Sequence, residues 1–96
     1  MTLRIAQRAR RHLDEIADYI QERNPDAARR VGERIREVIA LVGEIPLLGR
    51  EGVLAGTREM VVPGLPYVIV YRIEDDTVAV LGVYHGAQQR PGQRKR

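Results

Sequence analysis

Apolar residues recur at helical spacing through the first half of the chain. Between Arg8 and Arg23 they stand mostly three or four positions apart, and charged residues fill the opposite side. The same spacing returns from Pro25 to about Gly43 or Glu44. The first set comprises Ala9, Leu13, Ile16, Ala17 and Ile20, and the second comprises Ala28, Val31, Ile35, Val38, Ile39, Leu41, Val42 and Ile45. This pattern predicts two amphipathic helices, the second with a broader apolar face.

The junction between the two predicted helices carries strong end signals. Asn24 is a favoured N-cap, because its side-chain oxygen can accept a hydrogen bond from an unpaired backbone N–H. Pro25 fits the first helical position, where no donor is needed, and Asp26 places negative charge at the positive end of the helix dipole. One helix should therefore end near Arg23 and the next should begin at Pro25.

The remaining predicted elements are strands. Thr2 to Ala6 alternates apolar and polar residues, which predicts a short first strand. Pro46 to Gly56 reads as a loop because Pro and Gly recur in it. Thr57–Val62, Tyr67–Ile73 and Thr77–His85 are rich in β-branched residues or form nearly unbroken apolar runs, and turn residues separate them. We predict three further strands there.

The predicted order β-α-α-β-β-β indicates an α+β fold with one domain over residues 1–89. The short link between the helices favours an antiparallel hairpin, and the short links between the last three strands favour an antiparallel meander. The hairpin can cover one face of this small, mostly antiparallel sheet. We therefore expect the other face to be partly open or covered by a second polypeptide.

Positive charge is concentrated at the end of the sequence. The chain has 96 residues and a formal net charge of +3. Residues 90–96 hold four basic side chains and no acidic one, whereas the rest of the chain has twelve basic and thirteen acidic residues. A basic tail of this kind suits nucleic acid or an acidic protein partner, or simply keeps the protein in solution.

Composition also excludes several classes of protein. The sequence has no Cys, so it has no disulfide framework and no Cys-ligated metal. It shows neither a signal-peptide pattern nor an apolar stretch of transmembrane length. We expect a cytoplasmic protein that requires no cofactor and no metal and that makes no membrane contact.

Four groups of residues resemble the ParE/RelE superfamily of toxins. They are residues 16–20 (IADYI), 24–28 (NPDAA), 46–50 with 56–59 (PLLGR, GTRE), and 66–71 with 83–86 (PYVIVY, VYHG). Each group alone describes caps, turns and core. In this order and at these distances they are fairly specific, and the resemblance covers most of the chain, from about Leu3 to Pro91.

The resemblance implies the toxin of a type II toxin–antitoxin system, neutralised by a cognate antitoxin in a hetero-oligomer. Toxins similar to RelE cut mRNA on the ribosome, whereas toxins similar to ParE block DNA gyrase without hydrolytic chemistry. Both outcomes inhibit growth. A member that has lost toxicity and acts only in the antitoxin complex is a third possibility.

Metal-free cleavage of RNA needs a base, an acid and cations around the phosphate. RelE-like sequences usually carry an Arg in the middle strand, at the position of Val68, and often another at the position of Gln88. Neither residue here can stabilise a phosphorane as a cation, which favours the ParE-like branch. We leave open whether the protein is an enzyme; if it is, we expect a metal-independent mRNA endonuclease.

The candidate catalytic residues for that case are His85, Arg58 and Arg90. His85 closes the last strand and has an ordinary pKa near neutrality, although a His there can also simply cap the sheet. Arg58 lies in a strand and either faces the open side of the sheet or pairs with a helix carboxylate. Arg90 is placed to substitute for the missing cation at Gln88.

The candidate antitoxin-binding or target-binding residues are Arg50, Arg58, Tyr84 and His85. Strand alternation places Tyr84 and His85 on opposite faces, so they should not act side by side. Tyr67 and Tyr71 share the parity of Ile69 and Ile73 and should face the core, whereas His12 should be a solvated surface residue.

Overall fold

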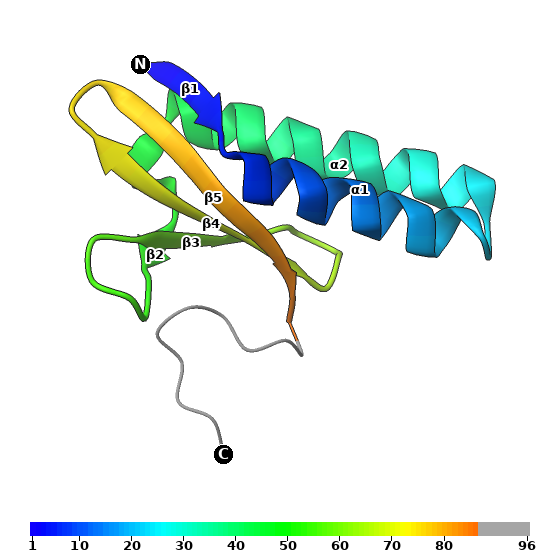
Figure 1. The fold of residues 1–96 in the computed structure, drawn as a ribbon. Helices are drawn as coiled ribbons and strands as arrows, with labels where there is room; N and C mark the ends of the chain where they lie inside the picture. The colour runs from blue at the N-terminus through cyan, green and yellow to red at the C-terminus, as the bar shows by residue number, and fades with distance from the viewer. Residues whose placement is uncertain (87–96) are drawn as a thin grey trace.

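The computed structural model of the protein describes residues 1–86, and its elements follow the expected order (Figure 1). The predicted tail over residues 90–96 lies outside the described residues. The elements are β1 (Thr2–Ile5), α1 (Gln7–Gln21), α2 (Pro25–Glu44), the 3₁₀ turn η1 (Pro46–Leu48), β2 (Arg50–Glu51), β3 (Arg58–Val61), β4 (Tyr67–Glu74) and β5 (Thr77–His85). Within residues 1–86 no helix is long and apolar enough to cross a membrane.

The helix junction forms as predicted. The Asn24 side chain accepts a hydrogen bond of 3.1 Å from the Ala27 N–H, and Pro25 occupies the first position of α2. The two helices lie side by side along one face of the sheet (Figure 1). Two members of the predicted apolar face of the second helix are wrong: Ile45, at its C-cap, is 49% exposed, and Leu41 is 40% exposed. It lies about 100° around the helix from the buried Val42, which turns it out of the core.

The sheet has five strands in the order β1-β5-β4-β3-β2. β1 pairs with β5 in parallel, and the other neighbours are antiparallel, which confirms the predicted meander. β2 and η1 were not predicted, and both lie inside the predicted loop at Pro46–Gly56. A two-residue strand is too short to show alternation, and its pairing with β3 is what defines it.

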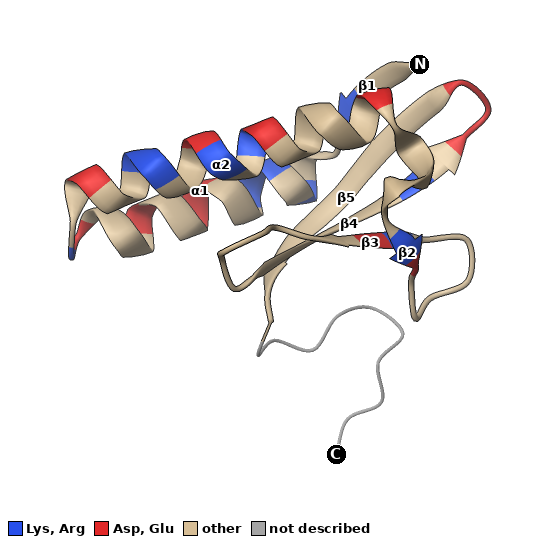
Figure 2. Ribbon diagram, turned by 180° about the vertical axis from the view of Figure 1, so that it is seen from behind, with Lys and Arg blue, Asp and Glu red and all other residues tan. Residues whose placement is uncertain are grey.

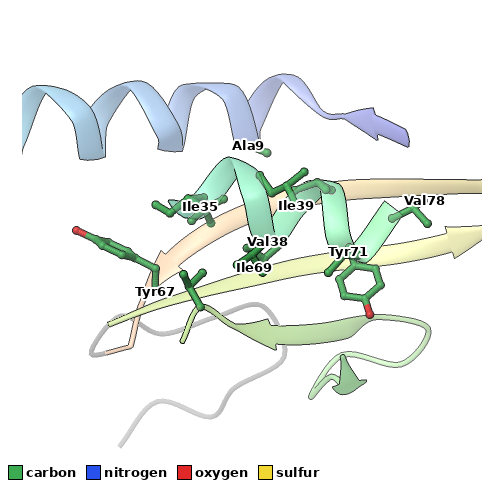
Figure 3. Packing of buried hydrophobic residues seen from close by; sticks show 12 residues of the cluster. Ala9, Ile35, Val38, Ile39, Tyr67, Ile69, Tyr71 and Val78 are labelled. Carbon is green, nitrogen blue, oxygen red and sulfur yellow. The ribbon is translucent and has the colours of Figure 1, made fainter. Parts of the chain in front are cut away.

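The main core lies between the helices and the sheet (Figure 3). Ile35, Ile39 and Val42 of α2 meet Ile69 and Tyr71 of β4, and all of them are at most 2% exposed. The core placement of Tyr67 and Tyr71 is confirmed. The Tyr71 hydroxyl is the polar atom that ties η1 to this core: it donates to the Pro46 carbonyl at 2.6 Å and accepts from the Gly49 N–H at 2.9 Å.

An extra residue in β5 decides which side chains share a face. Val70 pairs with Gly82, but Tyr71 pairs with Val80, so Leu81 is a bulge. Pairing partners lie on the same face. The side chains that do not join the helix-facing core therefore form a second face, which we call the distal face. Its members are Arg4, Arg50, Glu59, Val61, Val68, Val70, Arg72, Glu74, Ala79, Gly82 and Tyr84.

This second face is partly open, as expected, with an exposed edge and a buried centre. Val68, Val70 and Ala79 are at most 6% exposed, whereas Val61 is 49% exposed. The residues at the centre are Val68, Val70, Ala79 and Gly82, none of which has a long side chain. The distal face therefore presents its edges, rather than a bare apolar centre, to a partner.

Candidate functional site

Tyr84 lies on the distal face. Its ring still contacts α1, because His12 of that helix sits at the edge of β5. The nearest ring atom is 2.6 Å from the position that a Cβ on Gly82 would occupy. Any larger residue at position 82 would therefore clash with the ring where it packs on the sheet. The same ring meets the imidazole of His12 edge to face, with 4.9 Å between ring centroids. Tyr84 is half-buried as a result, and it is one of the predicted contact residues that the structure places on this face.

His12 is not the solvated surface residue predicted from the sequence. β1 ends at Ile5, so the edge of β5 continues beyond its parallel partner. The Val83 N–H on that edge donates a hydrogen bond of 3.1 Å to Nδ1 of His12. This bond requires an unprotonated Nδ1. Burial lowers the pKa of His12 below its ordinary value of 6.5. Glu15 raises this pKa by a smaller amount, and Arg11 and Arg8 lower it further.

Arg50 and Glu59 form an ion pair on the distal face, where β2 meets β3. Their closest charged atoms are 3.5 Å apart, and the Glu59 side chain is 3% exposed while that of Arg50 is 66% exposed. The Val53 N–H also donates to the Glu59 carboxylate at 3.4 Å. The burial of Glu59 was not predicted, because it depends on the pairing of β2 with β3. Arg50 is thus partly engaged within the protein.

Arg58 does not face the open side of the sheet. Its pairing with Tyr71 places it on the face that carries the helices and η1. There its guanidinium donates a hydrogen bond of 2.6 Å to the Gly49 carbonyl. The alternative, an ion pair with a helix carboxylate, is also wrong: within residues 1–86 the guanidinium binds the Gly49 backbone oxygen instead. Arg58 therefore fastens the segment after η1 to the sheet.

His85 lies at the end of β5 on the face opposite to Tyr84, as strand alternation predicted. It pairs with Tyr67, and the two rings meet edge to face with 5.7 Å between centroids. Burial raises the pKa of the Tyr67 hydroxyl, with a smaller contribution from Tyr19. The His85 side chain is exposed at this end of the sheet.

The structure does not bring the candidate catalytic residues together. Arg58 is paired with Tyr71 and His85 with Tyr67, so they are offset by four positions of β4, or about 13 Å along the strand. Arg90 lies outside the described residues. Over residues 1–86, no three His, Asp or Glu side chains are grouped so that they could hold a metal ion.

Charge on the distal face lies at its edges. Arg4 of β1 pairs with Glu74 at 3.1 Å, and both side chains are about half exposed. Arg72 is half-buried on the same face and lies in one cross-strand row with Ala79 and Arg4. Figure 2 shows that the long strands are otherwise mostly uncharged, while blue and red segments alternate along the helices. This arrangement suits recognition of a protein surface more than reaction at one point.

Solved structures that share this fold include two from toxin–antitoxin systems. One is the chromosomal ParDE toxin–antitoxin system from P. aeruginosa, with a TM-score of 0.81, 20% sequence identity, and coverage of 88% of this chain and 95% of that chain. The other is the toxin–antitoxin complex RelBE2 from Mycobacterium tuberculosis, with a TM-score of 0.59, 26% identity and the same coverages. Helical hairpin, mixed sheet and small size thus define the class of ParE/RelE-like α+β domains.

Sequence comparison identifies the family. Residues 3–90 match the model for the ParE toxin of the type II toxin–antitoxin system parDE. The chain is 48% identical over 84 residues to the putative toxin Y4kP of Sinorhizobium fredii, which covers 88% of this chain and 86% of that protein. It is 34% identical over 91 residues to toxin RelE1 of Caulobacter vibrioides, covering 93% and 97%. This chain belongs to the ParE/RelE family of type II toxins.

Proposed function

We propose that this toxin inhibits growth by binding DNA gyrase, without hydrolytic chemistry of its own. The observation that carries the proposal is the separation of Arg58 from His85. Arg58 is fixed to the Gly49 carbonyl on the helix-facing side, and His85 lies about four residues further along the sheet. A ribonuclease site needs these groups around one phosphate.

Val68 adds support from the distal face. It stands at the position where RelE-like sequences usually carry an Arg, and it is 6% exposed. An apolar side chain at this position offers neither a positive charge nor a hydrogen-bond donor to phosphate. The match to the ParE toxin model over residues 3–90 points to the same branch.

We further propose that a cognate antitoxin neutralises this toxin by forming a complex with it. The family model belongs to a two-component system, and the RelBE2 neighbour is itself a toxin–antitoxin complex. Because gyrase is a cytoplasmic target, we infer that the toxin acts in the cytoplasm. Arg50, Tyr84 and His85 are the contact residues that we assign to the antitoxin or the target.

A second candidate function is ribosome-dependent cleavage of mRNA. It is favoured by the likeness to the Caulobacter toxins named RelE1 and RelE2, the latter 35% identical over 81 residues. His85 would then act as acid or base, and Arg58 and Arg90 would supply the cations. The non-toxic alternative predicts that expression of the chain leaves growth unchanged.

The deciding experiment measures two activities of one purified protein. We expect it to inhibit supercoiling by gyrase and to leave mRNA intact on translating ribosomes. Addition of the product of the adjacent reading frame should restore supercoiling. Cleavage of mRNA that disappears in His85→Ala, with supercoiling unaffected by the wild-type chain, would refute the proposal. The control variant is Arg29→Lys, since the Arg29 side chain is 70% exposed on α2 and lines a crevice to which none of these residues belongs.

A further inference from the structure

A shallow groove lies where the first half of α2 meets the turn between β3 and β4. Its volume is about 330 Å³, and its lining residues include Ala27, Val31, Pro63 and Leu65 together with Arg30 and Arg34. Val31 and Leu65 are partly buried and pack against the edge of the core. The floor of the groove is therefore apolar and supported by the core, while its rim is cationic.

The charge of this groove has a single sign. Arg30 and Arg34 are four residues apart, so they lie on the same side of α2, one turn from each other. Three other crevices of residues 1–86 differ, because each is lined by both signs: Arg29 with Glu33, Arg10 with Asp14, and Arg58 with Glu51. The groove at α2 and the turn is the one that favours an anion.

Within residues 1–86, the guanidinium groups of Arg30 and Arg34 contribute little to the stability of the toxin. No ion pair of Arg30 is recorded among residues 1–86. Arg34 meets Glu37 at 3.4 Å, but both side chains are well exposed, and exposed pairs of this kind stabilise a protein little. Like charges four apart on a helix slightly oppose folding. A partner with carboxylates above the groove removes that repulsion and gains two charge-assisted hydrogen bonds.

We propose that this groove binds an acidic, amphipathic segment of the antitoxin. One aliphatic or aromatic side chain of the segment enters between Val31 and Leu65, and its carboxylates meet Arg30 and Arg34. This inference rests on the proposed antitoxin complex and names the surface through which the toxin forms it. It adds a contact region remote from Arg50, on the helix-bearing side of the molecule.

An acidic protein fits the groove better than a nucleic acid does. A nucleic acid is held by many cations along its backbone. Here two arginines border a floor of four apolar residues, and Glu33 and Glu37 stand on the same helix. An apolar floor with a charged rim is the usual composition of a site for a protein segment.

The test measures, by calorimetry, the affinity of the full-length toxin for the purified product of the adjacent reading frame. Arg30→Glu should weaken binding at least about tenfold, because it opposes the partner's carboxylates. Ala27→Leu should also weaken it about tenfold by filling the groove without changing the charge. Arg29→Glu is the matched control, because Arg29 is next to Arg30 in the sequence, carries the same charge and lines a different crevice. Its affinity for the product should change by about twofold or less.

The outcomes separate this inference from the proposed function. Equal affinity of wild type, Arg30→Glu and Ala27→Leu would refute the groove while leaving the antitoxin complex established. A wild-type chain that does not bind the product at all would refute both. Loss of duplex-DNA binding in Arg30→Glu, with unchanged affinity for the protein, would show that the groove binds nucleic acid and would also refute the inference. Unchanged thermal midpoints verify that each variant is folded.

Discussion

Removing the Tyr71 hydroxyl tests most directly what holds η1, the segment between α2 and β2, against the sheet. The side chain is fully buried, and its oxygen joins β4 to both ends of η1. It donates to Pro46 and accepts from Gly49, so Tyr71→Phe removes two hydrogen bonds while it keeps the ring. The substitution therefore separates hydrogen bonding from packing.

The expected loss follows from the fate of the two backbone groups. A hydrogen bond of this type contributes about 0.5–1.5 kcal/mol net, and a buried donor left without a partner costs about 1–3 kcal/mol. The Gly49 N–H is buried and becomes such a donor, whereas the Pro46 carbonyl is partly buried and can turn to water. We expect the free energy of unfolding of Tyr71→Phe to fall by about 2–3 kcal/mol.

Urea unfolding of wild type and variant, monitored by circular dichroism, measures this difference. The transition midpoint should shift while the slope stays the same, because both chains expose the same surface on unfolding. Tyr19→Phe is the matched control, since that hydroxyl is exposed and its loss should change stability by less than about 0.5 kcal/mol. A Tyr71→Phe effect as small as the control's would refute the account.

Three further outcomes are expected from local geometry. Asn24→Ala should lower the free energy of unfolding by about 1 kcal/mol through loss of the helix cap, measured by the same urea titration. Gly49→Ala should cost about 1–3 kcal/mol, because its Cβ would stand 2.6 Å from the Tyr71 hydroxyl. The folded-state pKa of His12 lies below that of the unfolded chain, so the stability that it contributes is fully present above pH 6.5 and is lost as the pH falls through the folded value. His12→Asn should remove that slope from a pH series of thermal midpoints, since the Val83 N–H then has no titrating acceptor.

The sequence predicted those features that depend on neighbours along the chain. Asn24 and Pro25 define a helix start through contacts within four residues, so the start of α2 was correct to the residue. Amphipathic spacing likewise found both helices, and alternation or runs of β-branched and apolar residues found β1, β3, β4 and β5. The pairing of β2 with β3 depends on residues 50 and 59, and no local pattern shows it.

The candidate site was harder to predict because its contacts join distant segments. His12 meets Val83, and their hydrogen bond spans 71 positions of the sequence. Nothing near His12 distinguishes it from a surface residue beside arginines. Arg58 was misplaced for a similar reason: its partner is the Gly49 carbonyl, and a backbone oxygen leaves no mark in the sequence.

The bulge at Leu81 explains why alternation misassigns part of β5. Val78 and Val80 face the helices, and an unbroken alternation would send Tyr84 to the same side and His85 to the other. The extra residue reverses this order, so His85 pairs with Tyr67 and Tyr84 lies beside Gly82 on the distal face. A bulge also sharpens local twist, which suits the point where β5 passes the end of β1 and takes His12 as its edge partner. One inserted residue thus determines which of the two candidate side chains each face of the toxin presents.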